Sequence, residues 1–168
     1  ILERAGFVAA ESETLMVLDL GAPAHAGLAA GDGIEIRRVV DVAGVGDFVS
    51  VTSTVFGRDD EWKAPAYVQS LEDAAIALFV AYRDGRPVSC GRLNLPAGRP
   101  FASMWGGSVV PEHRGLGIYR ALVTRRSDEA RRRGYRYLTT DARESSRPIL
   151  ERVGFVPLSR ITGWVLQP

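Results

Sequence analysis

The most informative part of the chain is residues 109–119, which read VVPEHRGLGIY. A strand-like run ends there, a glycine-bearing loop follows, and a helical pattern begins. The first N–H groups of a helix have no partner inside it and lie at the positive end of its dipole, so the segment suits a phosphate or pyrophosphate. Gly115 and Gly117 let the backbone approach a ligand closely, and Arg114 can add a charged contact. A tight turn into a helix explains the same residues.

The sequence around this loop predicts a complete set of strands and helices. Upstream we expect a strand at 34–40, helices at 41–56 and 65–72, a hairpin of 75–83 with 87–95, and a strand at 101–110 with a bulge at Gly106-Gly107. Downstream we expect a helix to Arg133, a strand at 135–141, a helix from Ser145 or Ser146 to Val153, and a strand from Phe155. This order predicts an α/β (α+β) fold, a mixed, mostly antiparallel central sheet with helices on both faces.

Composition excludes several classes of protein. The 168 residues are 46% hydrophobic and 24% charged, as in ordinary soluble domains. The net charge of +1 gives no support for nucleic acid or a membrane as partner. The single cysteine allows no internal disulfide, which favours a cytoplasmic location. The two histidines and Cys90 lack the spacing of a zinc site, so we expect no metal.

An internal repeat links the two ends of the chain. Residues 1–20 and 149–168 match at ten of twenty positions with a constant offset of 148. One interpretation is that residues 1–20 are the tail of a preceding related unit, with a helix end capped by Gly6 and a strand at 13–20. Residues 21–33 would then form a linker, and residues 34–168 the main domain. The other interpretation is that the similarity between two helix–strand units is a coincidence. An N-terminal strand of this kind could pair with its own sheet or a neighbour's, so a homodimer is possible.

Two motifs at the expected separation resemble the GCN5-related N-acetyltransferase (GNAT) family. Arg114-Gly115-Leu116-Gly117-Ile118-Tyr119 after Val109-Val110-Pro111 is similar to the family's motif A, and Ile149–Pro157 is similar to the end of motif B. The resemblance covers residues 34–168. It is closest to bacterial members that carry GIYRALV and SRPILER, here residues 117–123 and 146–152. It implies a GNAT-like acyltransferase domain.

The resemblance also implies a chemistry and a set of binding residues. An amine of unknown identity would attack the thioester of acetyl-CoA directly, without a covalent enzyme intermediate, so Cys90 is expected to be a core residue rather than a nucleophile. The strand at 101–110 would part from the strand at 135–141 to admit the cofactor. Trp62, Tyr67 and Trp105 are candidate substrate contacts, although the default interpretation of Trp105 is a core aromatic. The cofactor-binding residues implied are Val109, Val110, Arg114, Gly115, Leu116, Gly117, Ile118 and Tyr119.

Two departures from the family pattern leave the catalytic groups open. Tyr119 stands where the motif usually has Gly or Ala, so its ring must point away from the ligand. Leu150 stands where many members have the tyrosine that protonates the thiolate; Ser146 or Ser145, one turn earlier, or solvent could act instead. Asp141 is a candidate base, or it caps the following turn. A non-catalytic acyl-CoA-binding sensor or scaffold is therefore the alternative function.

Overall fold

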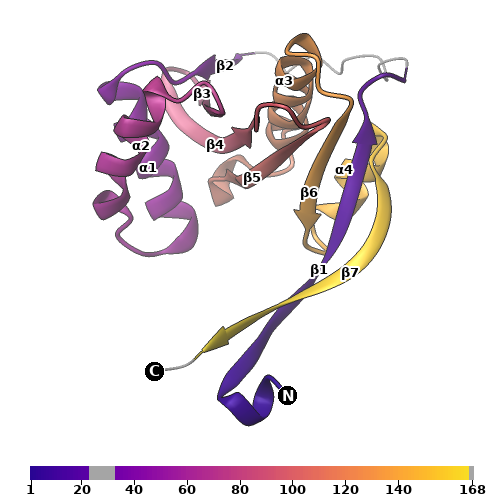
Figure 1. The fold of residues 1–168 in the computed structure, drawn as a ribbon. Coiled ribbons are helices and arrows are strands. Elements are labelled where there is room, and N and C mark those ends of the chain that lie inside the picture. Colours follow the sequence, from indigo (N-terminus) through magenta and orange to yellow (C-terminus); the bar gives the residue numbers. More distant parts are fainter. Residues whose placement is uncertain (23–32, 167–168) are drawn as a thin grey trace.

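The computed structural model describes residues 1–22 and 33–166, so most of the expected linker lies outside the described residues. These residues form one seven-stranded sheet with four α-helices (Figure 1). The elements are β1 (Phe7–Asp19), β2 (Ile34–Arg38), α1 (Val42–Phe56), α2 (Ala64–Gln69), β3 (Ile76–Arg83), β4 (Arg86–Asn94), β5 (Phe101–Val109), α3 (Ile118–Arg132), β6 (Tyr137–Ala142), α4 (Arg147–Val153) and β7 (Val156–Leu166).

The strand order is β2-β3-β4-β5-β6-β1-β7, and only the β5–β6 pair is parallel. The expected mixed, mostly antiparallel sheet is thus confirmed. The first strand differs from its expected bounds: it begins at Phe7 rather than residue 13, because it pairs with β7 from that residue onward. It lies within the sheet of its own chain, between β6 and β7.

Both faces of the sheet are covered, and β3 shows how. Successive side chains of a strand point to opposite faces. Leu78 and Val80 belong to a core cluster with residues of α1, whereas Ala77 and Phe79 belong to a cluster with residues of α3 and α4. Helices α1 and α2 therefore cover one face, and α3 and α4 the other.

Local sequence signals explain where these elements begin and turn. The Asp41 carboxylate accepts a hydrogen bond of 2.8 Å from the Gly44 N–H and so caps the start of α1. Asp84 and Gly85 both have positive φ, as a two-residue hairpin between β3 and β4 requires. None of the helices in the described residues is long and apolar enough to cross a bilayer.

The expected bulge lies at Gly106-Gly107, and a buried arginine lies beneath it. Cys90 pairs with Ser108 while Arg92 pairs with Trp105, so β5 has one residue more than β4 between these pairs. The Arg126 side chain of α3 is almost fully buried and donates hydrogen bonds to the Arg92 and Leu122 carbonyls, each 3.3 Å long. Burial lowers the pKa of its guanidinium.

Gly91 and Gly107 make room for this guanidinium. A Cβ on Gly91 would lie 2.7 Å from Arg126 Nη1, and one on Gly107 would lie 3.0 Å from Arg126 Nη2 and from Tyr119 Cε2. Glycine is therefore required on both strands because a side chain of α3 fills the space that a Cβ would take.

We expect Gly91→Ala to lower the free energy of unfolding by about 2 kcal/mol, because the new methyl group overlaps Arg126. Urea unfolding followed by circular dichroism measures it. Gly46→Ala is the matched control: nothing lies within 4 Å of that Cβ position, so alanine in α1 should raise stability by about 1 kcal/mol. Equal stability of Gly91→Ala and wild type would contradict the packing role of Arg126.

Candidate acyl-transfer site

Strands β5 and β6 diverge after a short parallel ladder. Their paired residues are Phe101–Tyr137, Ala102–Leu138 and Ser103–Thr139, after which one side-chain contact follows, from the Thr140 hydroxyl to the Met104 carbonyl at 3.3 Å. Beyond this point, within the described residues, β5 keeps strand partners only on β4. The expected separation of the two strands is confirmed, and it leaves one backbone edge of β5 without a ladder next to the bulge.

The glycine loop lies at the end of that edge and leads into α3. Gly115 and Gly117 both have φ of +77°, a conformation that other residues adopt at a cost. Gly117 is the N-cap of α3, and no side chain caps the helix. The N–H groups of its first turn, at residues 118–120, therefore have no partner within the helix. A Cβ at Gly115 would meet no atom within 4 Å, so the loop is open on that side.

Arg114 and the two valines border this loop. The Arg114 side chain is exposed, and its Nε donates a hydrogen bond of 3.3 Å to the Val109 carbonyl. Val109 is buried, whereas Val110 is half-buried and continues the pairing with β4 through a hydrogen bond of 2.9 Å from its N–H to the Val88 carbonyl. The residues expected to bind a cofactor thus line the diverging edge and the helix start as one continuous backbone path.

Tyr119 connects α3 to the start of α4. Its ring lies against Gly107, as expected for a side chain that packs on the sheet, and its hydroxyl lies near the Ser146 side chain. Burial raises the pKa of this hydroxyl, while nearby Arg126 and the Ser146 contact oppose that rise. Tyr119 therefore stays protonated at neutral pH and can act as a hydrogen-bond donor.

Of the two candidate serines, the structure brings only Ser146 to Tyr119. Ser146 is the N-cap residue of α4, yet its side chain makes no capping bond and instead donates to the Arg143 carbonyl at 3.1 Å. Ser145 is exposed. Leu150, at the position where many members of the family have a tyrosine, is fully buried in the core.

Asp141 and Trp105 lie on the face of the sheet opposite α3. Their neighbours Ala142 and Met104 point into the core beneath α3 and α4, so the alternating residues point the other way. Burial raises the pKa of the Asp141 carboxyl. Trp105 is 46% exposed and donates to the Ser103 hydroxyl at 2.9 Å, so it is not the core aromatic that tryptophan usually is.

Comparison with protein-family models then gives a clear match. The model of the acetyltransferase (GNAT) family matches residues 48–155, which contain the diverging strands and the glycine loop. The chain belongs to the GNAT family. No curated protein matches the chain in a sequence comparison.

Solved GNAT structures share the fold at low sequence identity. A GCN5-related N-acetyltransferase from Sphaerobacter thermophilus has a TM-score of 0.74 and 20% identity, with 96% of this chain and 53% of that chain covered. One from Kribbella flavida has a TM-score of 0.70, 16% identity, and coverage of 95% and 59%. A tandem GNAT protein from the clavulanic acid biosynthesis pathway has a TM-score of 0.73, 16% identity, and coverage of 96% and 55%. The chain spans a little over half the length of these three proteins.

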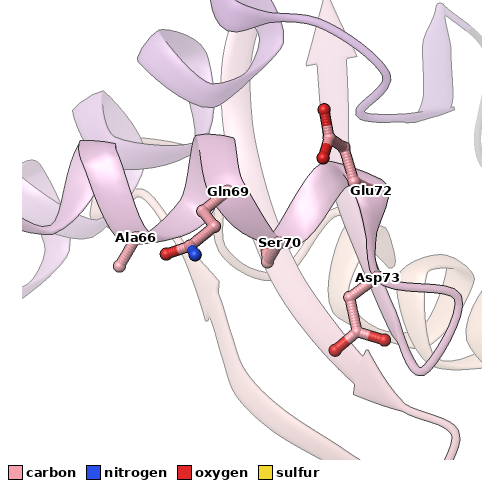
Figure 2. A pocket seen from close by; sticks show the side chains of 5 residues that line it. All are labelled: Ala66, Gln69, Ser70, Glu72 and Asp73. Carbon is pink, nitrogen blue, oxygen red and sulfur yellow. The ribbon is translucent and has the colours of Figure 1, made fainter.

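The remaining substrate-contact candidates lie around α2 of the GNAT fold. Trp62 is 75% exposed, and Tyr67 packs against Phe48 at 4.9 Å between ring centroids, so it contributes to the core under α1 and α2. A nearby open pocket of about 440 Å³ contains neither residue (Figure 2). Its lining residues, on α2 and the short turn after it, are Ala66, Gln69, Ser70, Glu72 and Asp73. This pocket of the described residues therefore does not join Trp62, Tyr67 and Trp105.

Gly91 and Arg126 are site residues that the sequence analysis did not identify. A glycine in the middle of a strand, opposite the glycine pair of the next strand, was the available signal for Gly91. Nothing in the sequence indicated that Arg126 is buried, because an arginine in a helix is ordinarily exposed. Cys90, expected to be a core residue, is fully buried, and burial raises the pKa of its thiol to about 12.

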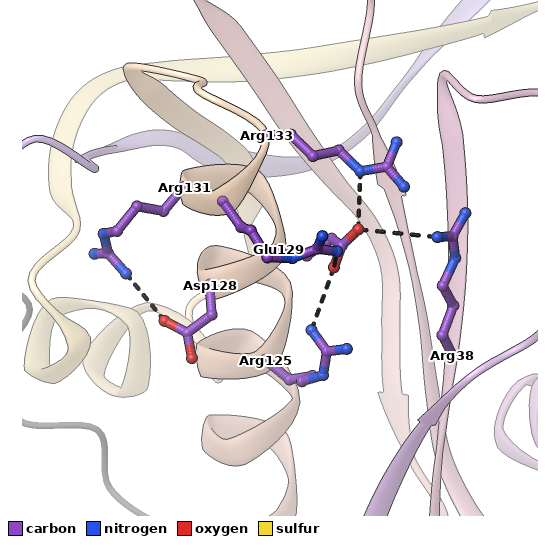
Figure 3. Close-up of polar contacts among 7 residues, drawn as sticks. Arg38, Arg125, Asp128, Glu129, Arg131 and Arg133 are labelled. Carbon is purple, nitrogen blue, oxygen red and sulfur yellow. Dashed lines mark hydrogen bonds and ion pairs between the residues drawn. The ribbon is translucent and has the colours of Figure 1, made fainter.

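The arginines at the end of α3 surround a buried carboxylate rather than the loop. Glu129 is fully buried, and Arg125, Arg132, Arg133 and Arg38 all pair with it (Figure 3). Burial alone would raise the pKa of Glu129, but the hydrogen bonds from Arg132 and Arg133 outweigh it and hold the pKa at about 2. Since the 15-residue helix is about 22 Å long, this cluster is far from the glycine loop.

We expect Glu129→Gln to lower the free energy of unfolding at pH 7 by about 2 kcal/mol, because the buried side chain loses the charge that accepts hydrogen bonds from partly exposed arginines. The Glu129 pKa is lowered in the folded state, so its contribution is fully present above pH 4.5 and is lost as the pH falls toward 2. The difference between variant and wild type should therefore shrink over that range. Chemical unfolding at pH 7, 4.5 and 2.5 measures it, and a constant difference would contradict the assignment.

Proposed function

We propose that this protein is an acetyl-CoA-dependent N-acetyltransferase. The observation that carries the proposal is the diverging β5–β6 pair, which ends in an uncapped helix start preceded by two glycines of positive φ. A cofactor with an extended arm and a pyrophosphate needs both features, one to pair along a backbone edge and one to bind an anion. Family membership and the fold shared with solved acetyltransferases support the same function.

The residues of this chain fit acetyl-CoA as a bound substrate. The N–H groups at residues 118–120 and the exposed Arg114 would hold the pyrophosphate, and the free edge of β5 up to Val110 would hold the arm. Acetyl-CoA supplies the thioester carbonyl that an amine attacks. The open side of Gly115 leaves the loop accessible to a ligand of this size.

Two groups could move the protons. Asp141, whose pKa is raised by burial, would accept a proton from the amine on the face opposite α3. Ser146 would donate a proton to the departing thiolate and regain one from solvent. The protonated Tyr119 hydroxyl, which lies near Ser146, would orient it from α3. The acceptor amine would approach past Trp105, on the Asp141 face of the sheet.

One observation favours a second function. Leu150 is fully buried, so no acid occupies the usual position on α4. A domain that binds acyl-CoA without turnover, as a sensor or scaffold, would keep the loop and the diverging strands and could lack this acid. Binding of acetyl-CoA without thiol release for any amine tested would favour this function. We place the protein in the cytoplasm as part of the same proposal, because acetyl-CoA and reduced thiols are found there together.

We expect saturating acetyl-CoA, at 100 times its dissociation constant, to stabilise the chain by about 2.7 kcal/mol. Differential scanning fluorimetry should show a rise in Tm of about 5–10 °C, with a smaller rise for AMP. Gly117→Asp should abolish the shift, because it introduces a negative charge and a strained φ at the helix start. Gly57→Asp, at another positive-φ glycine far from the loop, should keep it. A full shift with Gly117→Asp would contradict the proposed phosphate site.

We expect Ser146→Ala to lower kcat by about 100-fold while the dissociation constant of acetyl-CoA stays unchanged, because the hydroxyl acts only on the departing thiolate. Thiol release, followed with a chromogenic disulfide and a panel of primary amines, gives kcat, and calorimetry gives the dissociation constant. Ser145→Ala is the matched control and should match wild type, since Ser145 is exposed beside the helix start. An unchanged kcat for Ser146→Ala would remove this serine from the mechanism.

A further inference from the structure

The start of the chain has the same hydrogen bonds as the end of α4. The Gly6 N–H donates to the Glu3 carbonyl at 3.1 Å, and the Phe7 N–H donates to the Leu2 carbonyl at 3.1 Å. At α4 the equivalent donors, 148 residues later, are Gly154 and Phe155, and their bonds to the Glu151 and Leu150 carbonyls are each 3.0 Å long. Both glycines have positive φ, as this helix ending requires. The sequence repeat is therefore also a repeat of structure.

The two copies differ in what surrounds them. Leu150 is fully buried in the core, whereas its counterpart Leu2 is 41% exposed. Ile1, the counterpart of half-buried Ile149, is fully exposed. The first turn of the chain is thus a helix ending whose apolar residues have no core to pack into among the described residues.

The pairing of β1 with β7 is reciprocal under the offset of 148. The counterpart of a β1 residue is the residue of β7 that lies 148 positions later. For example, Val8 pairs with the counterpart of Val17, and Val17 pairs with the counterpart of Val8. Glu13 pairs with Ile161, its own counterpart, so the pseudo-two-fold axis passes through this pair. The reciprocal sets are Val8–Val165 with Val17–Val156, Ala9–Trp164 with Met16–Pro157, and Ser12–Thr162 with Thr14–Arg160.

Even the irregularities of the two strands obey this symmetry. The register shift between Ala9 and Ser12 places residues 10–11 of β1 opposite Gly163. The second shift places residues 158–159 of β7 opposite Leu15. Residues 158–159 are the counterparts of 10–11, and Gly163 is the counterpart of Leu15. A pairing symmetrical to this degree is typical of an interface between two related units.

The symmetry is broken at the outer edges of the two strands. Residues 14–19 of β1 pair with β6, whereas β7 is the edge strand of the sheet. As a result Met16 and Thr14 are buried. Their counterparts are more accessible: Trp164 is half-exposed and Thr162 is exposed. Val165 and Leu166 are also more than half exposed. A long edge strand that exposes apolar side chains is unusual, because such an edge readily pairs with another strand.

We propose that residues 1–19 are the C-terminal segment of a second, related GNAT unit in the same polypeptide, and that residues 162–166 of β7 bind the counterpart of β6 from that unit. The strand order at the junction is then β6, β1, β7 and the second unit's β6 counterpart. Each unit thereby lends its last strand to the sheet of the other. The partner's two helices after the glycine loop would cover Thr162 and Trp164, as α3 and α4 cover Thr14 and Met16. One of the solved structures that share this fold is a tandem GNAT protein, of which this chain spans 55%.

Hydrogen–deuterium exchange tests the edge directly. Amides in peptides from residues 156–166 should exchange about 100-fold more slowly in the natural full-length polypeptide than in the 168-residue chain, because a ladder forms on the outer edge of β7. Peptides from the β3–β4 hairpin should exchange equally in both and serve as the internal reference. Equal exchange of β7 in the two proteins would overturn the proposal. Protection of β7 already present in the 168-residue chain, and lost on dilution, would assign the edge to a second copy and overturn it too.

A pair of lysine variants in the full-length polypeptide locates the contact. Trp164→Lys places a charge where the second unit's helices would pack, so exchange in β7 should return to the fast rate. Leu158→Lys is the matched control: Leu158 is 61% exposed, and its counterpart Ala10 lies outside the stretch of β1 that pairs with β6. It should leave β7 protected. Equal protection in both variants would overturn the proposed position of the partner.

Discussion

A buried cation beneath a strand bulge organises the centre of this molecule. The guanidinium of Arg126 takes the space that side chains would need at Gly91 and Gly107, and it bonds to backbone carbonyls rather than to a carboxylate. The extra residue of β5 lies on this cation, and a bulge of this kind bends and twists its strand. Past the last pair with β6, at Ser103–Thr139, the strand continues with one edge unpaired, directly before the glycine loop. The candidate site depends on this departure from regular sheet geometry.

The sequence was sufficient to predict most of the fold because its signals are local. Asp41 caps α1, Asp84-Gly85 turns the β3–β4 hairpin, and the glycine loop precedes α3, each through contacts within a few residues. The position of β1 could not be obtained in this way. Its pairing with β6 and β7 joins residues more than a hundred positions apart, and no local pattern encodes which strands become neighbours.

The site was predicted to a similar depth. Glycine chemistry and helix geometry were sufficient to locate the loop and helix start at residues 114–119, whereas their role in binding a cofactor stays a prediction. The contact between Tyr119 and Ser146 depends on how α3 packs against α4, and the burial of Arg126 depends on two glycines of neighbouring strands. Trp105 was expected to be a core aromatic by default and is half-exposed instead, because β5 turns its alternate residues away from α3.

The strand order has a consequence for the path by which the chain folds. Strands β3 to β5 follow one another in the sheet as they do in the sequence, so contacts of short sequence separation can form this part first. β1 precedes these strands in the sequence but lies in the sheet between β6 and β7, which follow them. Its ordering must wait until more than a hundred further residues have been synthesised and β6 has formed. Because such long loops must close before the β1 ladders form, we expect the completion of the sheet to be slower than the formation of the β3–β4 hairpin.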